Sequence, residues 1–288
     1  MHAAFGRLDV KIICWGARGS IAVSGKEYVK YGGDTTCIEI RSKQNDIIIV
    51  DAGTGMRRLG NKLLTDEKRS YSFLLTHAHW DHLIGFPFFK PIYMKGSKIS
   101  MYGCPYAVDS VRTLIAQSMV APYFPVDFGM IQAELTTQSV CSDRFQIGSV
   151  TIEPIQLNHP NQGLGYKFIE DGKSFVFLTD NELTLKHKGG AEYQEYVRFS
   201  EGADLLIHDA EYTEAQYKMT KGWGHSVYTD ALRLAQNAQV KRFGLFLHNQ
   251  DRTDKELDTM VEDCRGIVAQ EGGTMKIFAA QAGKEIAF

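Results

Sequence analysis

The apolar positions of this chain fall into short continuous runs and helix-like repeats. Short runs rich in branched and aromatic residues, bounded by polar or glycine-containing stretches, predict β-strands. These predicted strands cover residues 10–15, 36–40, 47–50, 71–75, 99–103, 145–147, 150–157, 165–170, 174–178, 203–208, 242–247 and 274–279. The polar stretch 41–46 separates two of the runs and predicts a hairpin between them.

Apolar residues spaced three or four positions apart predict helices in the remaining segments. The predicted helices cover residues 56–64, 109–120, 192–199, 228–237 and 254–270. Ser226 or Thr229 is the expected N-cap of the fourth helix, since both side chains can accept a hydrogen bond from a free backbone N–H. The stretch 121–126 carries two prolines, so it does not continue the helix before it.

The order of these elements predicts the architecture. Strands dominate the first half of the chain, and strands alternate with helices in the second, without an internal repeat or a linker. This order favours two sheets with helices outside them, as one layered α/β domain over residues 1–288. A chain of 288 residues can bury a large core without a structural metal, so a bound metal would serve chemistry.

Composition narrows the classes of partner and the cellular compartment that we expect for this protein. The net charge is -2 and no Lys/Arg run exceeds a pair, which argues against long nucleic acids and leaves room for a small anionic substrate. The five cysteines, an odd number without CxxC spacing, are expected to be buried free thiols rather than a disulfide framework. No export signal or bilayer-spanning apolar run is visible, so we expect a cytoplasmic protein without a membrane partner.

One short segment concentrates metal-binding side chains. His77, His79, Asp81 and His82 lie within six residues, directly after the predicted strand 71–75. Histidine nitrogens and carboxylate oxygens are ligands for divalent metals. His77 and His79 are two apart and point the same way in extended backbone, whereas the next two side chains can face a second point nearby. Two adjacent divalent metals are therefore expected, an arrangement that activates water and stabilises a displacement.

The motif His77-x-His79-x-Asp81-His82 resembles the signature of the metallo-β-lactamase superfamily of hydrolases. The resemblance covers roughly residues 10 to 280 and implies a four-layer αββα sandwich with the metal site at one edge. It also implies that His159, Asp180 and His248, each after an apolar strand, complete the ligand set. The implied ligands are His77, His79 and His159 for one metal, Asp81, His82 and His248 for the other, and Asp180 between them.

The segment Trp223-Gly224-His225-Ser226 resembles a motif of the phosphodiesterase branch of this superfamily. That branch includes the tRNA 3′-end endonuclease and the phosphoribosyl cyclic phosphodiesterases. The resemblance implies that His225 contacts the scissile phosphate, where it could stabilise charge or protonate the leaving oxygen. The alternative is that His225 only caps the helix that follows.

The segment with Arg18 and Asp34 resembles part of the same branch, Asp51 resembles the first motif of the superfamily, and Asp209 is a candidate from its position at a strand end. Arg18, in a Gly/Ser-rich loop, could neutralise a phosphate; Asp34 stands where the branch more often has asparagine, and its role is left open. Asp51 is expected to support the site without binding metal, and Asp209 to orient a metal-bound histidine.

A helix-loop insertion around residues 105–128 resembles segments that lie beside the metal edge in small phosphodiesterase-like members. Its residues Tyr123 and Phe124 could stack on a base or sugar of the substrate. The alternative is ordinary packing of the insertion.

These features predict a dinuclear metal-dependent phosphodiesterase for a small, preferably cyclic phosphodiester, such as a cyclic nucleotide or phosphoribosyl cyclic phosphate. Asp81 would orient or deprotonate the attacking water, and His225 would act on the phosphate. Zinc is the expected metal, with manganese or iron as alternatives. The rival functions are tRNA 3′-end processing, lactone or thioester hydrolysis, and a metal-binding module without catalysis. Both a monomer and a homodimer are compatible with the sequence.

Overall fold

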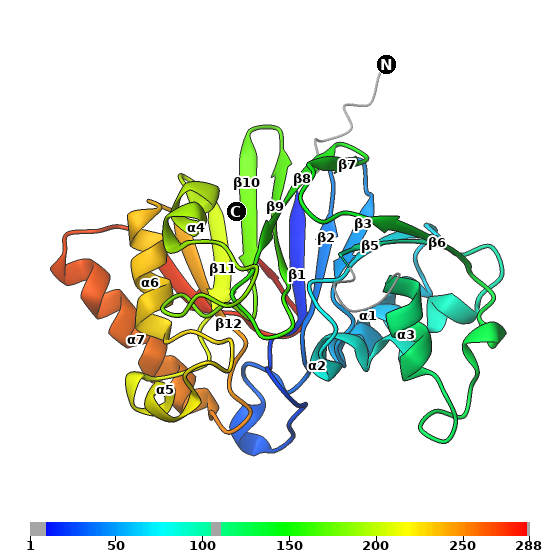
Figure 1. Ribbon diagram of the computed structural model, residues 1–288, viewed down its shortest axis with the longest axis horizontal. Coiled ribbons are helices and arrows are strands. Elements are labelled where there is room, and N and C mark those ends of the chain that lie inside the picture. Colours follow the sequence, from blue (N-terminus) through cyan, green and yellow to red (C-terminus); the bar gives the residue numbers. More distant parts are fainter. Residues whose placement is uncertain (1–9, 105–110, 287–288) are drawn as a thin grey trace.

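The computed structural model describes residues 10–104 and 111–286, which form two seven-stranded β-sheets packed face to face (Figure 1). The first sheet has the order β14-β1-β2-β3-β4-β5-β6. It is antiparallel from β14 to β3 and parallel from β3 to β6. Its strands are β1 (Lys11–Gly16), β2 (Cys37–Arg41), β3 (Ile47–Val50), β4 (Ser70–Leu74), β5 (Lys98–Gly103), β6 (Glu134–Ser139) and β14 (Lys284–Ile286).

The second sheet has the order β13-β12-β11-β10-β9-β8-β7. It is antiparallel from β7 to β10 and parallel from β10 to β13. Its strands are β7 (Phe145–Ile147), β8 (Val150–Gln156), β9 (Leu164–Glu170), β10 (Lys173–Leu178), β11 (Leu205–Asp209), β12 (Arg242–Phe246) and β13 (Lys276–Ala279).

Helices cover the two outer faces. On the first sheet lie α1 (Gly55–Leu63), α2 (Trp80–Leu83) and α3 (Val111–Ser118), with the 3-10 turns η2 (Phe86–Phe88), η3 (Lys90–Tyr93) and η4 (Phe128–Met130). The second sheet carries α4 (Tyr193–Ser200), α6 (Tyr228–Asn237) and α7 (Asp254–Gln270), with α5 (Glu214–Thr220) beside them; η1 (Lys26–Tyr28) lies near α7. None of the helices in the described residues has the length and apolarity needed to cross a membrane.

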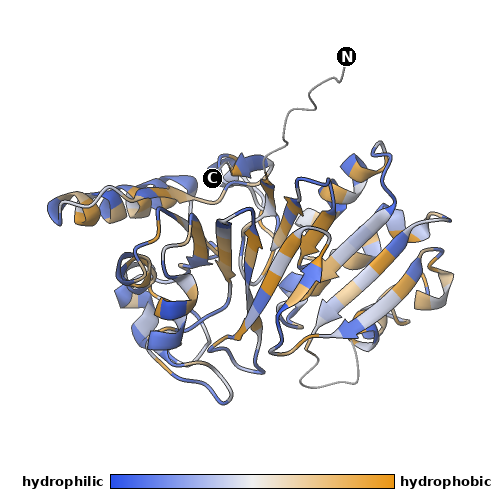
Figure 2. Ribbon diagram, turned by 90° about the horizontal axis from the view of Figure 1, so that it is seen from above, coloured by the Kyte–Doolittle hydropathy of each residue, from blue (hydrophilic) through white to orange (hydrophobic). Residues whose placement is uncertain are grey.

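Three apolar layers hold the four layers of structure together. Between the sheets, branched and aromatic side chains of both inner faces meet, such as Ile12 and Val50 against Phe177 and Phe246. Apolar residues run through the strands of both sheets when the molecule is seen from above (Figure 2). The outer layers are the apolar faces of the helices, and their burial is the main favourable term in the folding of such a sandwich. The predicted αββα architecture is confirmed.

Local differences from the sequence prediction have identifiable causes. Strand β6 and helix α5 were not predicted, because β6 is an exposed and largely polar edge strand and α5 has only seven residues. The N-cap of α6 is Val227, so the predicted caps were wrong. The Ser226 hydroxyl instead donates to Asn181 O and accepts from Leu183 N. Residues 109 and 110 of the predicted helix 109–120 lie outside the described residues, as does the start of the expected insertion.

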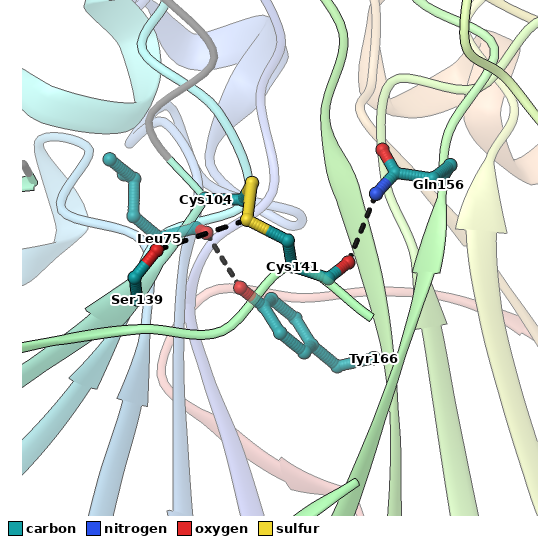
Figure 3. Close-up of a disulfide and its surroundings, with 6 residues drawn as sticks. All are labelled: Leu75, Cys104, Ser139, Cys141, Gln156 and Tyr166. Atoms are coloured by element: carbon teal, nitrogen blue, oxygen red, sulfur yellow. Dashed lines mark hydrogen bonds between the residues drawn. A yellow bond between two sulfur atoms is a disulfide. The ribbon is translucent and has the colours of Figure 1, made fainter. Parts of the chain in front are cut away.

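The expectation of free thiols was wrong for one pair of cysteines. Cys104 and Cys141 form a disulfide, with their Cα atoms 4.8 Å apart (Figure 3). They follow β5 and β6, which are neighbouring parallel strands, so the sheet register places them together although they are 37 residues apart in the sequence. Cys14, Cys37 and Cys264 are buried free thiols, as expected.

Candidate metal centre

The predicted metal ligands gather at one edge of the sandwich, where strands of both sheets end. The chain reaches this edge from β4, β8 and β10, and α2 begins there. Six predicted ligands meet at this edge: His77, His79, Asp81, His82, His159 and Asp180. They come from three segments of the chain, which the packing of one sheet on the other brings together.

The six side chains form two groups that share one carboxylate. The ligand atoms of His77, His79, His159 and Asp180 all lie within 4.8 Å of one another, and so do those of Asp81, His82 and Asp180. Asp180 Oδ2 lies 3.4 Å from His77 Nε2, and its Oδ1 lies 3.2 Å from His82 Nε2. One oxygen of Asp180 therefore faces each group, which is the arrangement that a bridging carboxylate needs.

Two buried imidazole nitrogens that face Asp180 without a hydrogen bond fit a bound cation. His77 Nε2 and His82 Nε2 are buried and hydrogen-bond to no described residue. An unsatisfied buried polar atom costs roughly 1–3 kcal/mol, which coordination of a metal would relieve. The other ring nitrogens are already held, since His82 Nδ1 donates to Asp51 Oδ2 at 2.8 Å and His159 Nδ1 donates to Gly224 O at 3.0 Å. Such contacts orient metal-binding imidazoles.

Burial and neighbouring charges set the protonation of the cluster. Burial, together with the neighbouring histidines, holds the pKa of His77 well below its usual value, and burial lowers the pKa of His159 to about 4. Both rings are therefore neutral, as metal ligands must be. Burial would also lower the pKa of His82, but Asp180, Asp81 and Asp51 outweigh it and raise this pKa well above the usual value. Without a metal, His82 itself would carry the positive charge that this group of carboxylates attracts.

The strand ends that carry the acidic residues have uncommon backbone conformations. Asp51, after β3, has a φ of 60° and Asp180, after β10, has a φ of 40°, in the left-handed region that non-glycine residues seldom adopt. The turn at Asp51 lets its carboxylate accept from Thr76 N and Thr76 Oγ1, both at 2.8 Å, and from His82. Asp51 thus lies where it can orient a predicted ligand, although it belongs to neither ligand group.

His248 is the one predicted ligand that the structure does not bring into either group. Its Nε2 donates to Ala280 O at 2.8 Å, and its ring packs edge-on against Tyr31. Its Nδ1 is buried and hydrogen-bonds to no described residue. Burial lowers its pKa to about 3, so the ring is neutral. Its assignment to the second metal remains a prediction from the resemblance.

His225 lies beside the first group but has a different electrostatic environment. Its Nδ1 is 2.9 Å from Asp209 Oδ2 and 3.3 Å from Glu211 Oε2, and its ring centre is 5.2 Å from that of His159. Burial would lower its pKa, but Glu211 and Asp209 outweigh burial and raise the pKa to about 10. His225 is therefore a cationic donor at neutral pH. The sequence suggested that Asp209 orients a metal-bound histidine, but its carboxylate contacts His225, which is not a predicted ligand.

Two buried glutamates that were not predicted shape this side of the site. Glu211 supplies the second carboxylate on His225, and burial raises its pKa to about 7. Glu182 accepts from Gly222 N at 2.8 Å and Gly224 N at 2.9 Å, and so holds the loop that carries His225. Each lies two positions after another acidic residue near a strand end, but that spacing alone does not reveal a role.

The predicted phosphate contact of Arg18 does not agree with its position. Arg18 is fully buried, and its guanidinium donates to the backbone carbonyls of Gly32, Asn249 and Arg252 at 3.0, 3.1 and 2.7 Å. It ties two loops together and does not face a substrate. Asp34 also has structural partners, because its carboxylate accepts from Thr54 Oγ1 at 3.0 Å.

Two cavities flank the ligand cluster. One, of about 540 Å³, is lined on the His225 side by polar residues that include Ser20, Glu211 and Asp251. The other, of about 600 Å³, is lined by both aromatic residues singled out in the insertion, Tyr123 and Phe124. Phe124 also packs edge-on against Phe88, with ring centres 5.6 Å apart, whereas Tyr123 is 80% exposed.

Comparisons with known proteins agree with this architecture. A ribonuclease Z from Latilactobacillus sakei is 23% identical over 242 residues, which cover 71% of this chain and 78% of that protein. The structure of unliganded yeast PDE1 matches with a TM-score of 0.71 and 15% identity, covering 97% of this chain and 99% of that one. The short form of human tRNase Z matches with a TM-score of 0.66 and 17% identity, covering 96% and 98%.

The family comparison covers most of the site. The sequence model described as "Beta-lactamase superfamily domain" matches residues 46–248, which is more than half of the chain. This range includes all seven predicted metal ligands and His225. The two-sheet fold and the ligand cluster at its edge agree with that match, and the chain belongs to the metallo-β-lactamase superfamily.

Proposed function

We propose that this protein is a metal-dependent phosphodiesterase that hydrolyses a small phosphodiester, preferably a cyclic one such as a cyclic nucleotide or phosphoribosyl cyclic phosphate. The observation that carries the proposal is the position of His225 beside the ligand cluster. Two buried carboxylates keep this ring cationic, and a cationic donor stabilises the charge that develops on a phosphate during hydrolysis.

The ligand cluster would hold two divalent cations. We assign His77, His79 and His159 to one cation, Asp81 and His82 to the other, and Asp180 to both. His248 is assigned to the second cation from the resemblance alone. Zinc is favoured by the number of imidazole ligands, and manganese and iron are the alternatives. When bound, the cations would polarise the phosphate and lower the pKa of water.

The remaining steps fall to residues of the chain. Asp81 is buried, its Oδ2 accepts from Ser20 N at 2.9 Å, and it would orient the attacking water and take its proton. The Nδ1 of His225 is held by Asp209, whereas its Nε2 makes no hydrogen bond to any described residue. The Nε2–H group is therefore left to donate to the substrate. That proton would go to a phosphate oxygen or to the departing alkoxide.

A second candidate function is tRNA 3′-end processing, because several curated relatives are named ribonuclease Z. The resemblance to that enzyme would predict a long Gly/Pro-rich arm between Asp180 and His225. Here this interval contains α4, β11 and α5, joined by loops. The net charge of -2 also argues against a long anionic substrate. A lactone or thioester hydrolase is disfavoured because it has no need of the cationic His225.

A substrate panel with measured metal content tests the proposal. The substrates are a cyclic nucleotide, phosphoribosyl cyclic phosphate, bis-p-nitrophenyl phosphate, a precursor tRNA and a lactone. We expect about two metals per chain and turnover of the small phosphodiesters without cleavage of the tRNA. A metal content near zero with activity intact would refute the metal assignment. Turnover of only the tRNA or only the lactone would replace the proposed function, and no turnover with zinc, manganese or iron would favour a non-catalytic metal-binding module.

A further inference from the structure

We propose that the apolar cavity beside the metal motif is a specificity subsite for an aromatic or other apolar group of the substrate phosphodiester. The inference rests on the proposed phosphodiesterase function and specifies which diesters it would favour. The cavity is lined by residues of α2 and η2 and by residues of α3 and the segment that follows it. Helices α2 and α3 are neighbours on the first sheet (Figure 1).

The cavity lies beside the ligand cluster and is separated from it by a smaller cavity. Ala78, which stands between His77 and His79, lines both this cavity and a neighbouring one of about 180 Å³. The smaller cavity is also lined by His77 and His79 themselves, and Leu114 of α3 is shared by both. A substrate whose phosphate lies at the metal ligands can therefore extend one substituent into the larger cavity.

The exposed apolar side chains of this protein are concentrated here. Among the described residues ten large hydrophobic side chains are exposed, and five of them line this cavity. The five are Trp80, Ile84, Phe88, Val120 and Tyr123. Single exposed hydrophobic residues are common on protein surfaces, but a group of this kind marks a site that binds a ligand or a partner.

The chemistry of the lining favours an uncharged, flat group. Among the described residues that line the cavity there is no lysine, arginine, histidine, aspartate or glutamate, so these residues offer a phosphate no charged partner. Trp80, Phe88, Tyr123 and Phe124 instead offer aromatic surfaces for stacking or edge-to-face contact. A volume of about 600 Å³ is in the usual range for sites that bind small molecules.

The cleft on the other side of the cluster suits the other end of the substrate. It contains His225 and Glu211 together with apolar residues such as Trp223, and none of its described lining residues belongs to the apolar cavity. A leaving oxygen that receives a proton from His225 would lie on that side. The apolar cavity would then select the substituent that stays on the phosphate, for example an aryl group or the base of a nucleotide.

Two linear diesters that share a leaving group test this inference. Methyl p-nitrophenyl phosphate and phenyl p-nitrophenyl phosphate both release p-nitrophenolate and differ in the retained substituent. For the wild type we expect the phenyl ester to have the higher kcat/KM by about tenfold or more, as a filled apolar pocket provides. Phe88→Ala should lower this phenyl-to-methyl ratio at least threefold, and Val120→Asp should lower it further by placing a carboxylate in the cavity.

The exposure of these side chains makes the variants informative. Phe88 and Val120 are 50% and 44% exposed, so their exchange should not unfold the protein, which thermal unfolding and metal content check, and the ratio of the two esters cancels any change in turnover that both share. Met130→Ala is the matched control, since Met130 is an exposed apolar residue that does not line the cavity. This control should leave the ratio unchanged.

Three outcomes would overturn the inference, and they differ from one another. An unchanged phenyl-to-methyl ratio in both cavity variants, with turnover retained, would reject the subsite and leave the phosphodiesterase function standing. Turnover of neither ester by the wild type would reject the proposed function and the subsite with it. A dimer that dissociates in Phe88→Ala, without a change in the ratio, would assign the surface to a second copy of the chain.

Discussion

Exchanging Asp209 for asparagine should lower the pKa of His225, so that the ring loses its proton at a lower pH. Asp209 is fully buried and accepts from His225 Nδ1 at 2.9 Å, whereas Glu211 lies slightly farther from the same nitrogen, at 3.3 Å. Asparagine has nearly the same shape and can keep the backbone contact that Asp209 Oδ1 makes with Glu211 N at 3.0 Å. The change removes one charge, and it also places an amide NH2 group where Asp209 Oδ2 now accepts from His225 Nδ1 at 2.9 Å and from Asn181 N at 3.1 Å.

The size of the effect follows from the strength of this contact. A hydrogen bond to a charged group contributes about 1.5–3 kcal/mol. Since one pKa unit corresponds to about 1.4 kcal/mol, the loss should lower the pKa of His225 by roughly one to two units. The pKa of His225 in the metal-bound enzyme should therefore be lower in the variant by this amount, whatever value the two cations give it in the wild type. Because the protonated ring is the active form, kcat should decline as pH rises through this value, at a lower pH in the variant.

The assay is kcat against pH for a cyclic nucleotide and for bis-p-nitrophenyl phosphate, with the metal content checked at each end. The alkaline limb should move down by one to two pH units in Asp209→Asn. If His225 protonates the departing oxygen, the loss should be larger on the cyclic nucleotide, because p-nitrophenolate leaves without help. His225→Ala should retain both metals and lose about 10²- to 10³-fold in kcat.

A double mutant separates action through His225 from an independent role. Adding Asp209→Asn to His225→Ala should cost little further activity, since the ring that the carboxylate supports is gone. Asp204→Asn is the control, because this carboxylate lies at the other end of β11 and accepts from Ser174 N and Lys241. An alkaline limb that stays in place, or an equal loss with and without His225, would refute the reasoning.

Three further predictions concern the metals and the stability of the fold. Asp180→Ala should abolish activity and weaken both metals, because two cations would face each other without the carboxylate between them; elemental analysis at wild-type stoichiometry would contradict this. Burial lowers the pKa of His208 to about 4, so its neutral form stabilises the fold at pH 7 by about 3 kcal/mol, which is lost as pH falls from 6.5 to 4. Urea unfolding at pH 7 and 4.5 should show a smaller loss for His208→Gln than for the wild type, since His159 and His248 make both proteins acid-sensitive; an equal loss in both would refute the prediction. Reduction of the Cys104–Cys141 disulfide should lower the free energy of unfolding by up to about 4 kcal/mol through the loop it closes; thermal unfolding should shift with a phosphine reductant in the wild type and not in a Cys104→Ser/Cys141→Ser variant.

The elements that sequence predicts well here are those whose signal is local. Helices α6 (Tyr228–Asn237) and α7 (Asp254–Gln270) have the predicted bounds, because each repeats apolar residues on one face, and α7 also begins at the capping box of Thr253 and Glu256. Strand β3 is a run of four branched residues, which any sheet would bury. Strand β6 is mostly polar and exposed, and it is a strand only because β5 offers it a pairing edge.

The candidate site also contains some residues that the local sequence reveals and others that it does not. The cluster from His77 to His82 is visible because its ligands are neighbours in sequence. The loop contact of Glu182 could not be predicted, since it joins residues about 40 positions apart that meet only after the second sheet has formed. Arg18 shows the converse limit: residue type and a glycine-rich context suit a phosphate contact, but they do not determine whether the guanidinium faces outward or into the protein.

One loop sets two opposite protonation states at this edge. The rings of His159 and His225 are 5.2 Å apart, yet their pKa values lie near 4 and near 10. The difference arises at Nδ1, which donates to the uncharged carbonyl of Gly224 in His159 and to buried carboxylates in His225. Gly224 and His225 are consecutive residues, and Glu182 fixes their loop through Gly224 N. A shift of this loop would therefore disturb both rings at the same time, the neutral one suited to a metal and the cationic one suited to a phosphate. Burial of the Glu182 carboxylate is costly, and its hydrogen bond to Gly224 N opposes such a shift.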